Sequence, residues 1–230
     1  MVSAREQIFA TIRRSLGRDE LPATVVADLE ARVARHAPNL IPQRSRVQGD
    51  DLLALFCRKA DEVGTTSVQL TSLDAVPGAV SAYLRDNDLP RQIRMAPDPA
   101  LAQIPWGAQS HLEITYGRGE MTTLVGLTAC FAGVAETGTL VFLSGEERPA
   151  TLNFLPDTHI VVLHAADVVG AYEDALAKLR DVRGDAGFMP RTVNFVTGPS
   201  RTADIALQIV RGAHGPRRLH VMLIGHIPKA

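Results

Sequence analysis

The stretch DLLALFCRKADEVGTTSVQLTSLDAVPGAVSAYLRDNDLPRQIRM, residues 51–95, decides the fold class. Residues 51–63 place apolar side chains near one helical face and stop before Gly64, which predicts a helix. The following pattern is strand-like at 67–70, helical at 74–85 and strand-like again at 93–95. Helices that alternate with short strands are typical of βαβ units. The stretch therefore predicts an α/β protein with a mostly parallel sheet flanked by helices.

The same alternation continues towards the C-terminus. Further strands are expected at residues 111–116, 139–143, 160–164, 193–196 and 219–224, and further helices at 167–181 and 202–211. The segment FAGVAETGTLVFL, residues 131–143, differs because two apolar runs meet at Gly138. Glycine tolerates the positive φ of a tight turn, so an antiparallel hairpin is expected around Gly138.

The N-terminal residues have a different character. Ser3 and Glu6 have the spacing of a capping box, and apolar residues then recur at helical spacing up to Gly17. A second short helix is expected over 25–37, followed by an extended linker that contains Pro38 and Pro42. We therefore predict a helical N-terminal extension over residues 1–48 and an α/β domain over residues 49–230.

Composition narrows the functional classes. The 24 basic and 25 acidic residues nearly cancel, which argues against nucleic acid as a partner. No stretch approaches the ~20 apolar residues of a membrane span, and residues 1–16 lack the apolar region of a signal peptide. We expect a cytoplasmic protein with no membrane partner.

Cysteine and histidine usage predicts no metal site and no cofactor. Cys57 and Cys130 lie far apart and form no CxxC pair, so they are interpreted as reduced thiols. The seven histidines are scattered and form neither HxH nor HExxH. The chain also lacks the glycine patterns GxGxxG and GxxxxGK[ST] of nucleotide sites.

The first candidate loop is Glu136, Thr137, Gly138 and Thr139. A carboxylate within an apolar stretch is costly to bury unless it is paired, which makes Glu136 a candidate nucleophile, base or ligand anchor. The alternative is a solvent-facing Glu at a turn or one that caps backbone amides. Thr137, Gly138 and Thr139 are candidate ligand-binding residues beside it.

The second candidate loop contains Gly198, Ser200, Arg201, Thr202 and Asp204. It is expected to join a strand to a helix, where backbone amides, two hydroxyls and a guanidinium could bind a phosphate or carboxylate. The alternative is a plain N-cap, with Asp204 favoured by the helix dipole.

A third loop, residues 212–220, contains His214, which could act as an acid, a base or a ligand. The alternative is a structurally hydrogen-bonded or surface histidine. All three loops lie in the C-terminal half, where we place a possible site for a small anionic ligand.

Four segments, read in order, resemble the LUD-domain family and, within it, the lactate utilisation protein C group: AETGTLVFLS, RPATLNFLPDTHIVVL, TGPSRTADI and HGPRRLHVMLIG. The opening helix SAREQIFATIRRSLG is also similar to the start of that group, so the resemblance spans nearly the whole chain. It implies a fold like that of the NagB/RpiA/CoA-transferase superfamily. One position departs from the pattern, because Ala206 stands where the family suggests an acidic residue.

The resemblance also implies a role in oxidising L-lactate to pyruvate beside two iron–sulfur partner proteins. The first hypothesis is a non-redox accessory or regulatory subunit. The second is an independent enzyme, similar to CoA-transferases or sugar-phosphate isomerases, in which Glu136 is the nucleophile or base. The third is a small-ligand sensor that performs no chemistry.

Overall fold

The computed structural model describes residues 3–17, 21–184, 189–202 and 210–225. By its internal contacts the chain separates into two units, residues 1–40 and residues 41–230. The domain division predicted after residue 48 stays a prediction.

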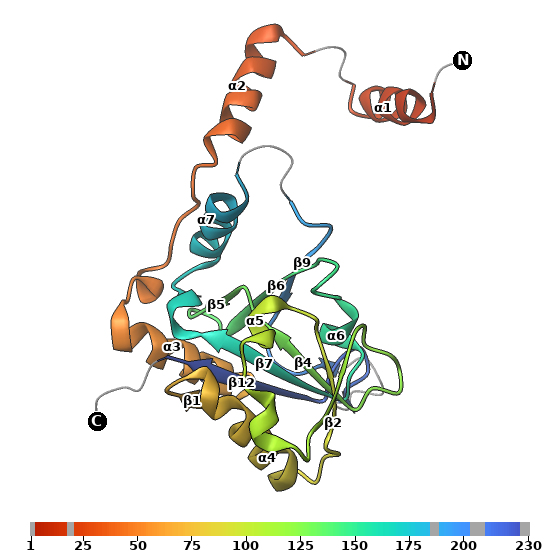
Figure 1. Cartoon of the computed structure of the whole chain (residues 1–230). Coiled ribbons are helices and arrows are strands. Elements are labelled where there is room, and N and C mark those ends of the chain that lie inside the picture. The colour runs from red at the N-terminus through yellow and green to blue at the C-terminus, as the bar shows by residue number, and fades with distance from the viewer. Residues whose placement is uncertain (1–2, 18–20, 185–188, 203–209, 226–230) are drawn as a thin grey trace. The chain divides into compact units, whose positions relative to one another are not determined.

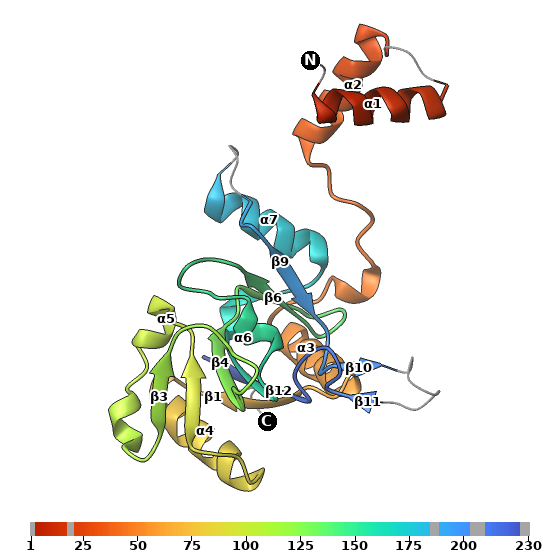
Figure 2. The same cartoon turned by 90° about the vertical axis from the view of Figure 1, so that its right-hand side faces the viewer.

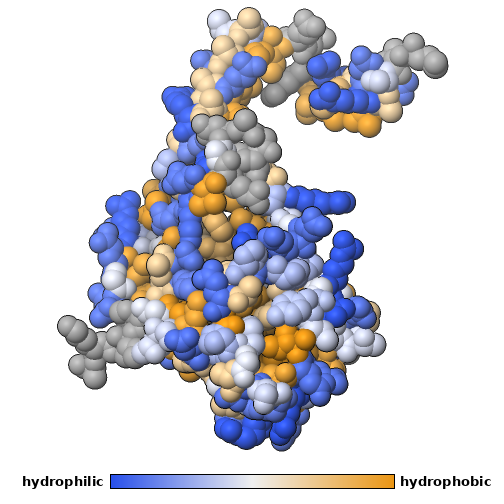
Figure 3. All heavy atoms as spheres, in the orientation of Figure 1, coloured by the Kyte–Doolittle hydropathy of each residue, from blue (hydrophilic) through white to orange (hydrophobic). Residues whose placement is uncertain are grey.

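The first unit contains two helices, α1 (Ala4–Ser15) and α2 (Ala23–Arg35). The expected capping box is present, because the Ser3 hydroxyl accepts from the Glu6 amide at 3.2 Å and the Glu6 carboxylate accepts from the Ser3 amide at 2.7 Å. α2 is capped by His36, the residue after its last turn, whose backbone is left-handed with φ 44°. The hydrophobic residues of α1 gather along one side of the helix (Figure 3). The presence of α1 and α2 confirms the helical N-terminal region predicted from the sequence.

The second unit contains all the strands and the remaining helices of the described residues (Figure 1). Its α-helices are α3 (Gly49–Glu62), α4 (Val76–Asp86), α5 (Pro99–Ala102), α6 (Thr151–Phe154) and α7 (Tyr172–Arg183). Its short 3-10 turns are η1 (Gln43–Ser45), η2 (Leu73–Ala75), η3 (Trp106–Gln109) and η4 (Ala165–Asp167). No helix among the described residues is both long and apolar enough to cross a membrane.

The larger sheet has six strands in the order β1 (Thr66–Leu70), β12 (Arg218–Ile224), β7 (Thr158–His164), β4 (Val125–Ala129), β2 (Gln92–Met95) and β3 (Glu113–Tyr116). Every pairing in it is parallel. The mostly parallel α/β sheet predicted from the sequence is therefore confirmed. The sequence did not indicate β4, a five-residue run of mostly small and apolar residues without the alternation that marks a half-buried strand.

The two faces of this sheet belong to different apolar cores. Along β7, Ile160 and Val162 join a core that includes Val80 and Leu84 of α4. The alternate residues Val161 and Leu163 join a second core built around Phe56 of α3. Side chains alternate across a strand, so helices cover both faces and the central strands are largely apolar on both sides.

The smaller sheet has four strands in the order β8 (Val168–Val169), β5 (Ala132–Val134), β6 (Thr139–Leu143) and β9 (Val193–Val196). β5 and β6 are antiparallel neighbours, and Val134 pairs with Thr139 across the turn. The hairpin predicted around Gly138 is therefore confirmed. β6 lies within the second core through Leu140 and Phe142, so this sheet packs on the same side of the large sheet as α3.

Two helices predicted from the sequence need correction. The helix expected over 202–211 is wrong at its ends, because β10 (Arg201–Thr202) and β11 (Val210–Arg211) pair as antiparallel strands (Figure 2). Thr202 and Val210, the paired β-branched residues, favour this extended form. The helix expected from residue 167 begins only at Tyr172, because Val168 and Val169 first pair with β5.

Candidate functional site

The turn that carries Glu136 is pressed against helix α3. Gly138 has φ 66°, and a Cβ there would lie 2.3 Å from the Ala60 amide nitrogen. No side chain fits such a distance, so glycine is required for both the backbone angle and the close approach. The position of Gly138 is thus explained by packing as well as by its place in a candidate loop.

Four hydroxyls join this turn to the neighbouring strand. Thr139 is fully buried, and its hydroxyl lies 2.7 Å from that of Thr137, 2.9 Å from that of Tyr172 and 2.7 Å from that of Thr197. The Thr137 hydroxyl also donates to the Tyr172 hydroxyl at 3.1 Å. A hydroxyl both donates and accepts, so the hydroxyls of such a cluster satisfy each other's hydrogen-bonding capacity without water or a ligand. Thr137 and Thr139 are therefore already engaged within the protein.

Glu136 itself is only partly buried, and its backbone amide donates to Gly170 O at 3.1 Å. Its Oε2 atom is buried and has no hydrogen-bond partner within the described residues. A buried carboxylate oxygen without a partner is unfavourable and invites a functional explanation.

The second candidate loop lies against the end of α3. Gly198 has φ 80°, and a Cβ there would lie 2.6 Å from Val63 O. The Arg201 guanidinium donates to the same carbonyl. Thr202 lies in β10, while Asp204 and Ala206 lie outside the described residues. Since Arg201 and Thr202 are strand residues, the helix N-terminus expected to hold an anion does not begin at this point.

Ser200 connects the second loop to the third. Its amide donates to Pro216 O at 2.8 Å, and its hydroxyl accepts from the His214 amide at 3.2 Å. His214 is exposed, and its contact with Ser200 is made by its backbone. The structure thus brings the predicted loops together through the Thr139–Thr197 and Ser200–His214 bonds. Within the described part of the chain, no hydrogen bond or ion pair joins the Glu136 side chain to Arg201 or His214.

A second region, which the sequence reading did not identify, is a cavity of about 210 Å³. It lies at the carboxyl ends of β4 and β7, which are Ala129 and His164. Its lining consists of Asp98, Ala100, Leu101, Ala129, Cys130, Phe131, Leu143, Arg148, Val162, His164, Asp167 and Lys178.

The position of this cavity follows from the topology. From β2 the chain passes outward to β3, whereas from β4 it passes the opposite way to β7. Neighbouring strands whose connections diverge leave a crevice at their carboxyl ends, which is where open α/β sheets bind ligands. Asp98 follows β2 and Cys130 follows β4, so the cavity is located at this crevice.

One wall of the cavity is an ion pair. Arg148 Nε lies 2.5 Å from Asp98 Oδ2, and Asp98 Oδ1 accepts from the Ala100 amide at 3.0 Å. The Asp98 side chain is 1% exposed, whereas that of Arg148 is 45% exposed. The bonded carboxylate raises the pKa of the Arg148 guanidinium. Asp98 therefore holds Arg148 in place while the outer part of the guanidinium remains accessible.

Another wall contains a second cation. Lys178 of α7 donates to Asp167 Oδ1 at 2.5 Å and to Phe131 O at 3.0 Å, and its Nζ lies 4.9 Å from the centre of the Phe131 ring. These contacts tie α7 to the segment between β4 and β5. Cys130, beside it, donates its thiol to Ala132 O, and burial raises its pKa to about 12. Cys130 is thus a protonated wall residue, unsuited to nucleophilic attack.

The signals for this cavity were weak in the sequence, because its charged residues come from four separate segments. Asp98 follows a predicted strand and directly precedes Pro99, and an Asp–Pro pair of this kind is a typical helix start. In the sequence, this pair was the local pattern that indicated a structured loop at this edge of the sheet. The pairing of Arg148 with Asp98 and of Lys178 with Asp167 exists only in three dimensions.

A family model for the LUD domain matches residues 108–224, which include most of the cavity lining and all three candidate loops. The chain belongs to the LUD-domain family. Within that family it resembles proteins named lactate utilization protein C.

The similarity to "Lactate utilization protein C" of Geobacillus sp. strain WCH70 is 34% identity over 44% of this chain and 42% of the relative, so the match spans about two fifths of that protein's length. The protein of the same name from Anoxybacillus flavithermus is 27% identical over 95% of this chain and 98% of its own length. The crystal structure of a DUF162 family protein from Deinococcus radiodurans has a TM-score of 0.57 at 23% identity, and the match covers 78% of this chain and 99% of that one. This last similarity supports the fold alone.

Proposed function

We propose that this LUD-domain protein is a component of a lactate-utilisation system that oxidises L-lactate to pyruvate, and that it serves as a non-redox accessory or regulatory subunit. The observation that carries the proposal is its similarity to the A. flavithermus lactate utilization protein C, which extends over 95% of the chain. The matched region includes both the α/β unit and most of the helical N-terminal residues.

The accessory role is supported by the cysteine content of the chain. An iron–sulfur cluster is usually held by four thiolates, and the full sequence has two cysteines. Cys130 is bonded to backbone carbonyls, and Cys57 accepts from the Gln69 amide group at 3.7 Å. In this proposal, partner proteins that carry iron–sulfur clusters move the electrons, and this chain binds a ligand or the partners.

The test combines genetics with biochemistry. Deletion of the gene should abolish growth on L-lactate as sole carbon source, and a plasmid copy should restore it. The purified chain alone should not reduce an artificial electron acceptor in the presence of L-lactate. Normal growth of the deletion strain, or lactate oxidation by the isolated chain, would contradict the accessory role.

One observation favours a second candidate, an independent enzyme of the CoA-transferase or sugar-phosphate-isomerase type. It is the buried, partnerless Oε2 of Glu136, since an activated carboxylate could act as nucleophile or base. The purified chain would then turn over an acyl-CoA or a sugar phosphate, and Glu136→Gln would abolish the reaction. An unchanged rate in Glu136→Gln would exclude the mechanism, and Glu113→Gln, at an exposed position, is the matched control.

A further inference from the structure

The cavity between Arg148 and Lys178 has more hydrogen-bond donors than acceptors. A guanidinium has five N–H groups, and Arg148 directs its Nε and one terminal nitrogen to Asp98. Lys178 directs its ammonium group to Asp167 and Phe131 O, and its third hydrogen has no partner among the described residues. The His164 ring, also at the cavity wall, has no side-chain hydrogen bond within the described residues.

The acceptors of the same cavity are mostly engaged. Asp98 is almost completely buried, and both of its oxygens accept hydrogen bonds from Arg148 or the Ala100 amide. Asp167 binds Lys178 through Oδ1. The donors that remain therefore favour a ligand that brings its own negatively charged acceptors.

The rest of the lining limits the size and polarity of that ligand. The cavity volume of about 210 Å³ lies below the roughly 300–1,000 Å³ of pockets that bind drug-sized ligands, so it suits a small molecule better than a nucleotide. Leu101, Leu143 and Val162 contribute buried apolar surface to the wall. An anionic head with a short apolar body satisfies both kinds of lining.

We propose that this cavity binds a short monocarboxylate of about three to five carbons, with the carboxylate held by the Arg148 guanidinium and the Lys178 ammonium group and the carbon chain against the apolar wall. Asp98 and Asp167 are positioning residues, because each fixes the cation that contacts the ligand. His164 lies at the same wall, where a ring nitrogen can bond a hydroxyl or oxo group at the second carbon. Binding does not depend on the proposed function, although the choice of lactate and pyruvate among the probes does.

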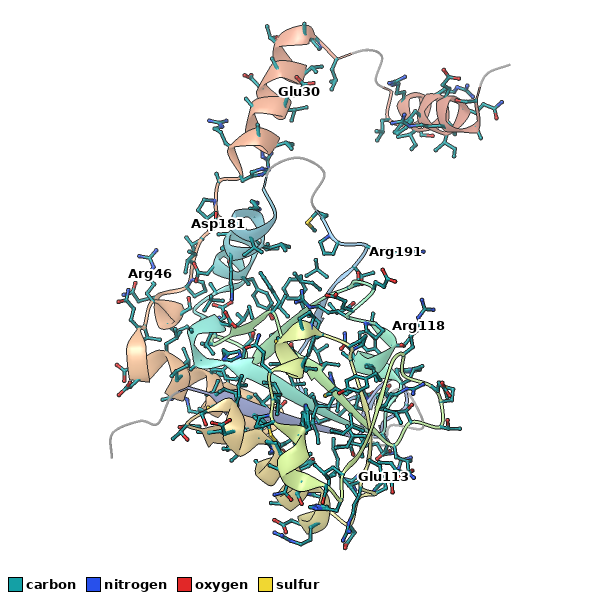
Figure 4. The ribbon with its side chains drawn as sticks, in the orientation of Figure 1. Glu30, Arg46, Glu113, Arg118, Asp181 and Arg191 are labelled. Atoms are coloured by element: carbon teal, nitrogen blue, oxygen red, sulfur yellow. The ribbon has the colours of Figure 1, made fainter. Side chains whose placement is uncertain are left out.

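The experiment is isothermal titration calorimetry of the full chain with propionate, L-lactate, pyruvate and butyrate, beside inorganic phosphate and chloride. Saturable binding of the monocarboxylates is expected, with phosphate and chloride at least ten-fold weaker. Arg148→Gln should weaken monocarboxylate binding at least ten-fold, and Arg148→Lys should weaken it less. Arg191→Gln is the matched control, because Arg191 is exposed and points away from the body (Figure 4).

A second variant keeps the proposal testable if Arg148→Gln fails to fold. Ala100 lines the cavity from α5, so Ala100→Leu narrows the cavity without changing any charge and should abolish binding. The proposal would be overturned by unchanged monocarboxylate affinity in Arg148→Gln or in Ala100→Leu. It would also be overturned if Arg148→Gln and Arg191→Gln lost affinity equally, or if the wild-type chain bound phosphate as tightly as the monocarboxylates. Saturable binding of propionate but not of lactate or pyruvate would support the site and count against the lactate system as its context.

Discussion

Arg148 Nε lies 2.5 Å from Asp98 Oδ2, although the two residues are 50 positions apart in the sequence. The pair connects the loop after β6 to the loop after β2, on the N-terminal side of α5. Asp98 also caps α5 through the Ala100 amide, so one carboxylate holds both the helix start and the cation of the cavity.

Asp98→Asn should therefore destabilise the protein by about 1–3 kcal/mol, because a neutral amide replaces the buried carboxylate that accepts hydrogen bonds from Arg148 and the Ala100 amide, while the half-exposed Arg148 can still be solvated. Urea denaturation measures the free energy of unfolding. Asp181→Asn, at an exposed position of α7, should change it by less than about 0.5 kcal/mol. Equal stability of the two variants would show that the Arg148–Asp98 pair does not hold the loop.

Gly138→Ala should be strongly destabilising, by more than about 2 kcal/mol, because a Cβ would collide with the backbone of α3. Gly49→Ala is a useful comparison, since Gly49 has φ 57° and its Cβ position has no atom within 4 Å. That variant should lose only the cost of the positive φ, roughly 1 kcal/mol. If the two variants lose equal stability in urea, the packing of the turn against α3 is not the cause.

Thr139→Val should cost about 1–3 kcal/mol, because it removes the central hydroxyl of the cluster and leaves Thr137, Thr197 and Tyr172 with fewer partners. The two side chains have nearly the same shape, so packing is preserved. Thr122→Val, at an exposed position, is the control and should be almost neutral. The comparison is made by thermal and urea unfolding, and a neutral Thr139→Val would mean that the cluster adds nothing to stability.

The two buried histidines predict an acid-sensitive fold. Burial lowers the pKa of His220 to about 4 and that of His159 to about 3, from an ordinary 6.5. Between pH 6.5 and these values the unfolded chain binds more protons than the folded chain, so stability falls as the pH decreases. The slope should be roughly 1.4 kcal/mol per pH unit for each histidine, and it should end below the folded pKa.

Urea denaturation at several pH values between 4.5 and 7.5 tests this slope. His220→Gln should reduce it by about half, since Thr66 and Tyr83 no longer surround a titrating ring. The exposed His214→Gln should leave it unchanged. A slope unaffected by His220→Gln would contradict the assignment.

The two cysteines should react with a thiol reagent at very different rates in the native protein. Cys130 is buried and its thiol stays protonated, whereas Cys57 is partly exposed. One thiol should therefore react quickly and both should react in denaturant. Cys57→Ser identifies the fast thiol, and a fast reaction remaining in that variant would show that Cys130 is accessible.

The regular part of the fold could be predicted because its strands and helices are local patterns. The strand at 193–196 and the capping box at Ser3 match the structure directly. β4 was missed because a short, largely apolar run has no periodicity that distinguishes a strand from a buried helical turn. The helix expected over 202–211 was wrong at both ends, where pairing between Thr202 and Val210 outweighs helical spacing.

The candidate loops were recognisable because glycines and polar residues interrupt apolar runs, and their mutual contact through Thr139 and Thr197 follows from the sheet. The cavity was not recognisable, since Asp98, Arg148 and Lys178 become neighbours only when strands from distant segments align. No local pattern indicates that Lys178, one of many polar residues on an amphipathic helix, points to Phe131 O. A site formed by residues that are distant in the sequence can be identified only once the order of the strands is known.

The order of strands in the large sheet also governs when the protein can fold during synthesis. β12, the last described strand, lies between β7 and β1, and β1 has no other partner strand among the described residues. A nascent chain therefore carries β1 unpaired until residues 218–224 have left the ribosome, some 150 residues later. During that interval the edges of β1 and β7 are open to wrong pairing, so slow translation of the final segment should increase the demand for chaperones.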